Sequence, residues 1–250
     1  MSREYLLNVN RIEFTVTMAC TGRCKHCSEG DHTLCREHID PKIAASSVKT
    51  ICEVFKIKSL MTFGGEPLLF PETVMAIHST AKEMEIPQRQ LITNGFFSKE
   101  ESKIRSVAEG LSESGVNDLL LSADAFHQET IPLEPVKLFA ECVLEAGIPI
   151  ELSPAWLVSR EDDNPYNVRT REILSEFDLP VGQGNIIFPY GNALKNLREY
   201  FGEDVKEFSP YEEDPKDIRT ISFSPNGDVL GGNVYEKDIL EILRTYDPGI

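Results

Sequence analysis

Three cysteines near the start of the chain have the spacing of metal ligands. Cys20, Cys24 and Cys27 form a Cys-x3-Cys-x2-Cys run, so three thiolates are available within eight residues. Structural zinc sites and iron–sulfur clusters normally close with four protein ligands. Because this run supplies only three, it predicts an iron–sulfur cluster in which one iron stays open. An open iron can bind a reactant.

A zinc site is the alternative interpretation of the same run. Such a site needs a fourth ligand, and three nearby residues have suitable side chains, namely His26, His32 and Cys35. The remaining cysteines, Cys52 and Cys142, fall within helical patterns, and we expect them to be reduced thiols in the core. Motifs elsewhere in the chain favour the cluster over zinc.

Three of these motifs stand at the ends of short apolar segments. They are Gly64-Gly65-Glu66-Pro67, Thr93-Asn94-Gly95 and Ser122-Ala123-Asp124. Glycines let a backbone approach a ligand closely, although they also serve simply to form a turn. Asn-Gly is a common turn, and an aspartate after a strand often caps the next helix. Each motif alone therefore has a structural interpretation beside the functional one.

The apolar segments alternate with amphipathic helical patterns. Six strands are expected over residues 12–17, 60–63, 90–93, 119–122, 148–152 and 185–188, and helical patterns over 41–55, 71–85, 98–111 and 136–144. This alternation indicates parallel βαβ units with right-handed crossovers. The carboxyl ends of such strands lie at one edge, where α/β folds build their sites. The cysteine run and the three motifs should therefore converge on one rim.

Together, the cysteine run, the apolar strand before it and the Gly-Gly-Glu-Pro motif resemble those of the radical S-adenosylmethionine (SAM) enzymes. The resemblance implies an α/β fold, a partial (β/α)6 barrel, with a [4Fe–4S] cluster held by Cys20, Cys24 and Cys27. In this family the fourth iron takes the amino and carboxylate groups of SAM. Reductive cleavage then yields a 5′-deoxyadenosyl radical, which abstracts a hydrogen from the substrate. The resemblance also implies an electron donor such as flavodoxin or ferredoxin.

The resemblance further implies which residues bind SAM. The Gly-Gly-Glu-Pro segment is expected at the methionyl ammonium, and the ends of the third and fourth strands near the rest of the molecule. The residues concerned are His26, Gly64, Gly65, Glu66, Pro67, Thr93, Asn94, Ser122 and Asp124. His26 lies between two cluster ligands, where family members often have an aromatic residue that abuts the adenine.

Asp124 and His127 are the candidate catalytic residues. Both follow the fourth expected strand. A histidine beside a carboxylate can donate or accept a substrate proton, because its pKa is readily tuned. The alternatives are an aspartate that only caps a helix and a loop histidine bonded to the backbone.

The pattern changes after about residue 190, so we expect a core over residues 1–190 and a C-terminal extension over 191–250 packed on it. Residues 220–230 predict a β-hairpin with an Asn-Gly turn, and 238–246 a closing helix. This extension resembles the SPASM or twitch extension of radical SAM enzymes. Its usual cluster cysteine is replaced in Leu230-Gly231-Gly232-Asn233, so we expect that the auxiliary cluster is lost. Residues 189–193 resemble a Pro-x-Gly-Arg-Ala segment, with Asn192 in place of arginine.

Composition limits the partners. The 250 residues, 41% hydrophobic and 26% charged, suffice for one sizeable core. The net charge of −16 argues against a nucleic-acid partner, whose phosphates this surface would repel. The first residues carry no apolar signal segment, and no stretch is long enough to span a bilayer. We expect a soluble cytoplasmic protein with no membrane partner.

The sequence leaves several functions open. We favour a radical SAM oxidoreductase that modifies a peptide or protein, because of the resemblance of the C-terminal segment. An activating enzyme for a glycyl-radical enzyme is the alternative, although Ser122-Ala123-Asp124 stands where activators typically carry Asp-x-Lys. A radical SAM reaction on a small molecule is also open. A metal-binding scaffold without catalysis would bind zinc and have no affinity for SAM.

Overall fold

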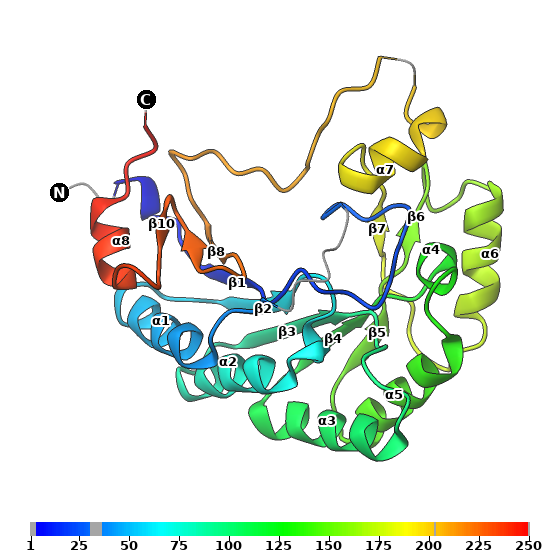
Figure 1. Ribbon diagram of the computed structural model, residues 1–250, viewed down its shortest axis with the longest axis horizontal. Coiled ribbons are helices and arrows are strands. Elements are labelled where there is room, and N and C mark those ends of the chain that lie inside the picture. The colour runs from blue at the N-terminus through cyan, green and yellow to red at the C-terminus, as the bar shows by residue number, and fades with distance from the viewer. Residues whose placement is uncertain (1–3, 31–36, 203, 250) are drawn as a thin grey trace.

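The computed structural model describes residues 4–30, 37–202 and 204–249. At its centre is a parallel sheet of six strands in the order β5-β4-β3-β2-β1-β8. The strands are β1 (Arg11–Thr15), β2 (Ser59–Phe63), β3 (Gln88–Thr93), β4 (Asp118–Leu121), β5 (Ile150–Leu152) and β8 (Thr220–Phe223). The outer face carries the helices α1 (Pro41–Val54), α2 (Pro71–Glu83), α3 (Glu101–Ser114) and α5 (Leu133–Glu145) (Figure 1). This confirms the predicted α/β fold, a partial barrel of parallel strands.

Alternating side chains divide the sheet into two faces. On β1, Ile12 and Phe14 are fully buried, whereas Arg11, Glu13 and Thr15 are only partly buried. The register continues the buried row onto both neighbouring strands. The buried face therefore packs under the helices, and the other face, on the concave side, carries polar side chains.

Local chemistry sets the helix boundaries that the sequence predicts. The Asp40 carboxylate accepts the N–H groups of Lys42 and Ile43, at 2.8 and 3.0 Å, and Pro41 is the first residue of α1. At the other end of the series, α5 stops before Gly147, whose φ of +78° favours glycine.

A smaller group of elements, α4 (Ala125–Gln128) after β4 and several short elements after β5, flanks the sheet (Figure 1). Its apolar cluster includes Phe126, Leu157 and Leu197, all fully buried. The elements after β5 are β6 (Ala155–Trp156), α6 (Pro165–Leu174), β7 (Asn185–Ile186), α7 (Gly191–Asn196) and a 3-10 helix (Arg198–Tyr200). From α7 the chain crosses the open side of the barrel to reach β8 (Figure 1).

The prediction that residues 185–188 form the sixth strand of the main sheet is wrong. Only Asn185 and Ile186 are extended there; both are exposed, and they pair with β6 in a separate two-stranded sheet. The sixth strand of the sheet is β8, which pairs with β1. Phe223 on β8 is 1% exposed and stacks on Phe14, with ring centroids 4.5 Å apart. Apolar burial against β1 therefore decides which segment completes the sheet.

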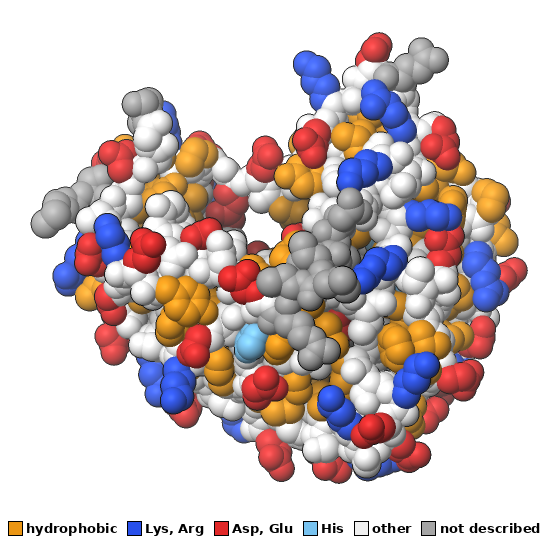
Figure 2. Space-filling model, viewed as in Figure 1, with side chains coloured by type: hydrophobic (Ala, Val, Ile, Leu, Met, Phe, Trp, Pro, Cys, Tyr) orange, Lys and Arg blue, Asp and Glu red, His pale blue; other side chains and the backbone are white. Residues whose placement is uncertain are grey.

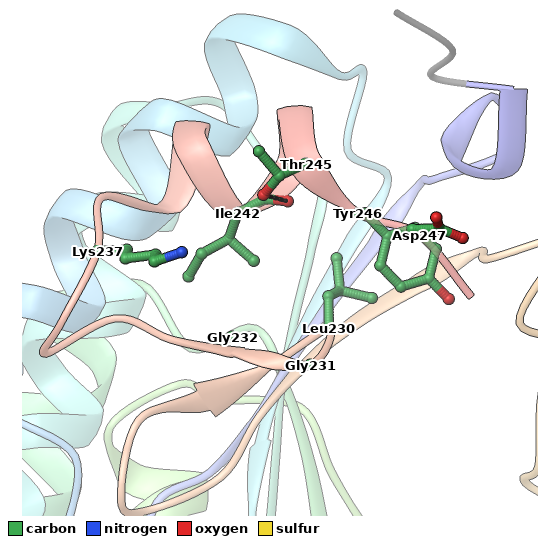
Figure 3. A pocket seen from close by; sticks show the side chains of 8 residues that line it. All are labelled: Leu230, Gly231, Gly232, Lys237, Ile242, Thr245, Tyr246 and Asp247. Atoms are coloured by element: carbon green, nitrogen blue, oxygen red, sulfur yellow. Dashed lines mark hydrogen bonds between the residues drawn. The ribbon is translucent and has the colours of Figure 1, made fainter. Parts of the chain in front are cut away.

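The C-terminal hairpin also differs from the prediction. Instead of pairing residues 220–223 with 228–230, the chain pairs β9 (Asp228–Val229) with β10 (Gly232–Asn233), and α8 (Ile239–Thr245) follows. A pocket between this hairpin and α8 is lined by Leu230, Gly231, Gly232, Lys237, Ile242, Thr245, Tyr246 and Asp247 (Figure 3). None of these residues is a cysteine or a histidine, which are the usual ligands of an iron–sulfur cluster.

Acidic and basic side chains are interspersed over the face seen in Figure 2. The outline is hollowed between the side formed by α8 and the side formed by α7 (Figures 1 and 2). Within the described part of the chain, no helix has both the length and the apolar character needed to cross a membrane.

Candidate active site

The three cysteines of the predicted metal site lie in one loop after β1. Cys24 is 7% exposed, and Cys20 and Cys27 are partly buried. Burial raises the pKa of the Cys20 thiol to about 11, and nearby Glu66 and Cys27 add to this effect. Burial likewise raises the pKa of Cys24, with further contributions from Asp124, Cys20 and Cys27. The mutual influence of the thiols reflects their proximity.

These thiols fit an iron–sulfur cluster on chemical grounds. None of the three forms a disulfide within the described part of the chain, so all three sulfurs can ligate a metal. Buried thiols without a metal hold their protons, and a metal that binds them displaces those protons and neutralises the thiolates. Of the candidates for a fourth zinc ligand, His32 and Cys35 lie outside the described residues. His26 packs its ring on Phe126 and His127, each at a centroid distance of 4.9 Å.

The Gly-Gly-Glu-Pro turn packs directly against the cysteine loop. The N–H of Gly65 donates to the Thr17 carbonyl and the N–H of Glu66 to the Ala19 carbonyl, both at 2.8 Å. A Cβ atom on Gly65 would lie 2.2 Å from the Ala19 oxygen. Gly64 has a φ of +131°, which also favours glycine. Close contact with the cysteine loop therefore explains both glycines.

The Glu66 side chain is a buried clamp between two strand ends. It is 0% exposed and accepts three hydrogen bonds: from the Leu68 N–H at 2.9 Å, the Thr93 hydroxyl at 2.8 Å and the Asn94 N–H at 2.9 Å. Burial raises the pKa of Glu66 to about 7, although these bonds oppose the rise. Pro67 begins the 3-10 helix Pro67–Leu69. The carboxylate is thus committed to protein donors.

The predicted SAM-binding residues at the ends of β3 and β4 lie at the same rim. Thr93 and Asn94 are 2% and 5% exposed. The Asn94 amide nitrogen lies 3.2 Å from the Thr21 hydroxyl and 3.6 Å from Cys20 Sγ. Ser122 is partly buried, and its N–H donates to the Thr93 carbonyl at 2.8 Å. The structure therefore brings the β3 end against the cysteine loop, as predicted for this rim.

Asp124 caps α4 and holds His127. Its fully buried carboxylate accepts the N–H groups of Phe126, His127 and Ala155 and the Nδ1–H of His127, the last at 2.8 Å. Burial opposes ionisation of Asp124, but the charge of His127 and these bonds outweigh it, so the pKa of Asp124 lies well below its usual range. Burial opposes protonation of His127, but Asp124 outweighs this and raises its pKa.

Asp124 therefore caps a helix, as its structural interpretation predicts. Because both of its oxygens accept protein donors, it can act on a ligand only through His127. His127 itself is 16% exposed. With Nδ1 donating to Asp124, its Nε2 is left as the ring atom for other partners. The Nδ1 atom of His26 is buried without a hydrogen-bond partner among the described residues, and burial lowers the pKa of His26 to about 4.

His26, Asp124 and His127 also place metal-ligand atoms within 4.8 Å of one another. Both oxygens of Asp124 already accept protein donors. A hydrogen-bonded unit that orients His127 accounts for this cluster without a metal.

Two contacts that sequence reasoning missed also hold the cysteine loop. The Arg23 N–H donates to the Thr130 hydroxyl at 3.0 Å. From α7, the N–H of Asn192 donates to the Cys27 carbonyl at 2.9 Å and its side chain to the Gly30 carbonyl at 3.0 Å. The only sequence signal for the second contact was the motif at residues 189–193. Asn192, which stands where the resembled segment has arginine, makes both of these hydrogen bonds to the cysteine loop.

The concave face of the sheet near the strand starts is also polar. Arg11 Nε lies 2.6 Å from a carboxylate oxygen of Glu13, and the Ser222 hydroxyl lies 3.5 Å from the other oxygen. Burial raises the pKa of Glu13. On β3 and β4 of the same sheet, Gln90 donates to Asp118 at 2.8 Å.

Comparison with known proteins finds curated proteins of similar sequence and solved structures of similar fold. GTP 3′,8-cyclase from Clostridium perfringens (strain 13) is 24% identical over 205 residues, which cover 74% of this chain and 60% of that protein. GTP 3′,8-cyclase from Clostridium acetobutylicum is 26% identical over 218 residues, covering 77% of this chain and 63% of that protein. The chain thus spans less than two thirds of these curated relatives.

Solved structures share the fold at low identity. A structure of histidine-tagged anSMEcpe with bound AdoMet has a TM-score of 0.62 and 14% identity, covering 96% of this chain and 81% of the other. SuiB of Streptococcus suis bound to S-adenosylmethionine has a TM-score of 0.58 and 17% identity, covering 96% and 66%.

A protein-family model matches the part of the chain that forms most of the site at the strand ends. Residues 14–149 match the model of the radical SAM superfamily, and this range contains the cysteine loop, the Gly-Gly-Glu-Pro turn and the ends of β3 and β4. The order of parallel strands and the position of the three cysteines after the first of them agree with that match. The chain is an enzyme that belongs to the radical SAM superfamily, whose members use a [4Fe–4S] cluster and SAM.

Proposed function

We propose that this radical SAM enzyme abstracts a hydrogen atom from a peptide or protein, using one cluster held by Cys20, Cys24 and Cys27. The observation that carries the proposal is the single loop with three reduced thiols, packed against the Gly-Gly-Glu-Pro turn at the strand ends. Three thiolate ligands leave one iron of a four-iron cluster without a protein ligand. That iron is where SAM would bind.

The chain's own residues would position the reaction. When bound, the cluster and SAM would supply a 5′-deoxyadenosyl radical, formed with methionine when one electron from flavodoxin or ferredoxin breaks the S–C5′ bond. Gly64, Gly65 and Ser122 stand at the rim where SAM would lie. His127, oriented by Asp124, would hold or move a proton at Nε2, next to the partly buried ring of His26.

The charge of the molecule supports a peptide over a nucleoside triphosphate. GTP carries several negative charges, and sites for such groups normally supply cations. Here the concave face carries Glu13 on β1 and Asp118 on β4, and the guanidinium of Arg11 already pairs with Glu13. The net charge is −16. A peptide with basic or neutral side chains suits this surface better.

The similarity to GTP 3′,8-cyclases makes GTP the second candidate substrate. In favour of a peptide stands the structure named "Native anSMEcpe with bound AdoMet and Kp18Cys peptide", which has a TM-score of 0.60 at 14% identity. That likeness concerns the fold, so the choice between substrates needs an experiment.

The test supplies both substrates to the same preparation. Anaerobically reconstituted enzyme is reduced with dithionite and given SAM with either GTP or a pool of lysine- and arginine-containing peptides. We expect peptides, and not GTP, to raise the rate of 5′-deoxyadenosine formation and to lose hydrogen, as detected by mass spectrometry. Stimulation by GTP alone, with a cyclised nucleotide product, would overturn the peptide proposal. The Cys20→Ala, Cys24→Ala, Cys27→Ala triple variant controls for cleavage without the cluster.

A further inference from the structure

The Asn94 side chain lies between the end of β3 and the cysteine loop. Its amide nitrogen is 3.6 Å from Cys20 Sγ, within the reach of an N–H···S hydrogen bond. We propose that Asn94 donates this hydrogen bond to the cluster ligand Cys20 and thereby raises the reduction potential of the bound cluster. The inference rests on the proposed ligation of the cluster by Cys20. In it, Asn94 acts on the cluster through Cys20, which is distinct from binding SAM.

The orientation of the amide follows from its other contacts. Asn94 Oδ1 accepts the N–H of Phe96 at 2.8 Å. The reversed amide would place two donors against each other there, so the nitrogen must face the cysteine loop. Its two hydrogens then have two acceptors, the Thr21 hydroxyl at 3.2 Å and the Cys20 sulfur. Every donor and acceptor of this buried amide is thus used.

Hydrogen bonds to Glu66 fix the position of Asn94 at the end of β3. The backbone N–H of Asn94 donates to Glu66 Oε2 at 2.9 Å, and the Thr93 hydroxyl donates to Glu66 Oε1 at 2.8 Å. Glu66 is 0% exposed and Asn94 is 5% exposed, so solvent competes little for these bonds. The Gly-Gly-Glu-Pro glutamate therefore fixes the amide that reaches the cluster ligand.

Two donors converge on the same sulfur. Besides Asn94, the backbone N–H of Gly22 donates to Cys20 Sγ at 3.3 Å. Reduction adds one negative charge to a cluster, and part of that charge resides on the sulfur ligands. N–H dipoles that point at a sulfur stabilise the reduced form and raise the potential. Of these two donors, only Asn94 can be removed by changing a side chain.

Two substitutions separate the hydrogen bond from charge. Asn94→Ser keeps an oxygen that can accept the Phe96 N–H, as serine does in local turns, but its side chain is too short to reach Cys20. Asn94→Asp keeps the size and the acceptor, loses the N–H and adds a negative charge. Asn185→Asp is the charge control, because Asn185 is exposed and its Oδ1 accepts the Tyr211 hydroxyl at 3.2 Å.

The measurement is a redox titration of the reconstituted full-length chain without SAM, followed by the electron paramagnetic resonance signal of the reduced cluster. Iron per chain is measured on the same samples. We expect Asn94→Ser to shift the midpoint potential to more negative values, Asn94→Asp to shift it further, and Asn185→Asp to match wild type. Iron content should stay at the wild-type level in all four proteins.

A wild-type potential in Asn94→Ser would overturn the inference even if Asn94→Asp shifts, because charge alone would then explain the shift. Loss of iron from both Asn94 variants, with iron retained by Asn185→Asp, would also overturn it in favour of a purely structural role. Absence of a cluster from wild type would instead contradict the proposed function.

Discussion

Glu66 connects the ends of three strands, two through its carboxylate and the third through its backbone N–H. It accepts donors from Leu68, Thr93 and Asn94, and its own N–H reaches the cysteine loop at Ala19. The family resemblance implies that this segment binds the SAM ammonium. The hydrogen bonds support a more indirect contribution from the side chain, which orders the turn whose backbone would meet SAM.

Glu66→Gln should destabilise the protein. One side of the amide would present N–H hydrogens to the N–H of Asn94, leaving a buried donor unsatisfied, which costs about 1–3 kcal/mol. Urea unfolding of the apo protein, above the pKa of Glu66, measures the change. The exposed Glu53→Gln is the control and should change the free energy of unfolding by less than about 0.5 kcal/mol. Equal stability of both variants would contradict the clamp.

His127 depends on Asp124 for its protonation. Asp124→Asn keeps the cap but removes the charge that raises the pKa of His127, so this pKa should fall. Histidine NMR titration of the apo protein measures it. Because the folded-state pKa of His127 is raised above 6.5, the pair stabilises the fold most below that pH. The contribution is lost as the pH rises through the folded pKa. An unchanged His127 pKa in Asp124→Asn would contradict the pairing.

At the scale of elements, the turn after β2 and the loop after β1 form one packed unit. Several backbone hydrogen bonds join them, and Gly65 allows the approach. The sequence predicted that these motifs share a rim, because parallel strands end at one edge. It could not predict that the glycines serve contact between two loops, since that depends on distances between segments some forty residues apart.

Gly65→Ala should therefore disrupt the cluster site. The new Cβ would lie 2.2 Å from the Ala19 oxygen, so the cysteine loop must move, and we expect loss of most of the bound iron. Gly147→Ala is the matched control, because Gly147 has a positive φ but no described atom within 4 Å of the added Cβ. The left-handed backbone conformation should cost about 1 kcal/mol in stability with alanine, and the iron content should stay unchanged. Wild-type iron in Gly65→Ala would show that the loops tolerate separation.

At the scale of the whole molecule, the sequence predicts the strands that carry the site correctly, but it does not predict which segment forms the sixth strand of the sheet. The first five strands follow buried apolar segments that local patterns reveal. The sixth, β8, comes from a segment about 200 residues after its neighbour β1. Residues 220–223 alternate as a hairpin strand would, and only the packing of Phe223 on Phe14 selects the main sheet. The predicted similarity to SPASM or twitch extensions stays a prediction.

A fragment ending at residue 190 tests the predicted boundary between core and extension. It would lack β8, leaving the β1 edge unpaired, and would lack the α7 contacts to Cys27 and Gly30. We expect this fragment to aggregate or to lose its cooperative unfolding transition, as circular dichroism would detect. A fragment that folds cooperatively and binds as much iron as the full chain would support an independent core instead.

The central claim is that one cluster held by three cysteines cleaves SAM. The most direct measurement is the amount of 5′-deoxyadenosine formed from SAM by dithionite-reduced protein containing about four irons per chain. We expect formation by wild type and none by the Cys20→Ala, Cys24→Ala, Cys27→Ala triple variant, which should bind no iron. The claim would be contradicted by iron-loaded wild type that makes no 5′-deoxyadenosine with any candidate substrate, or by equal formation in the triple variant.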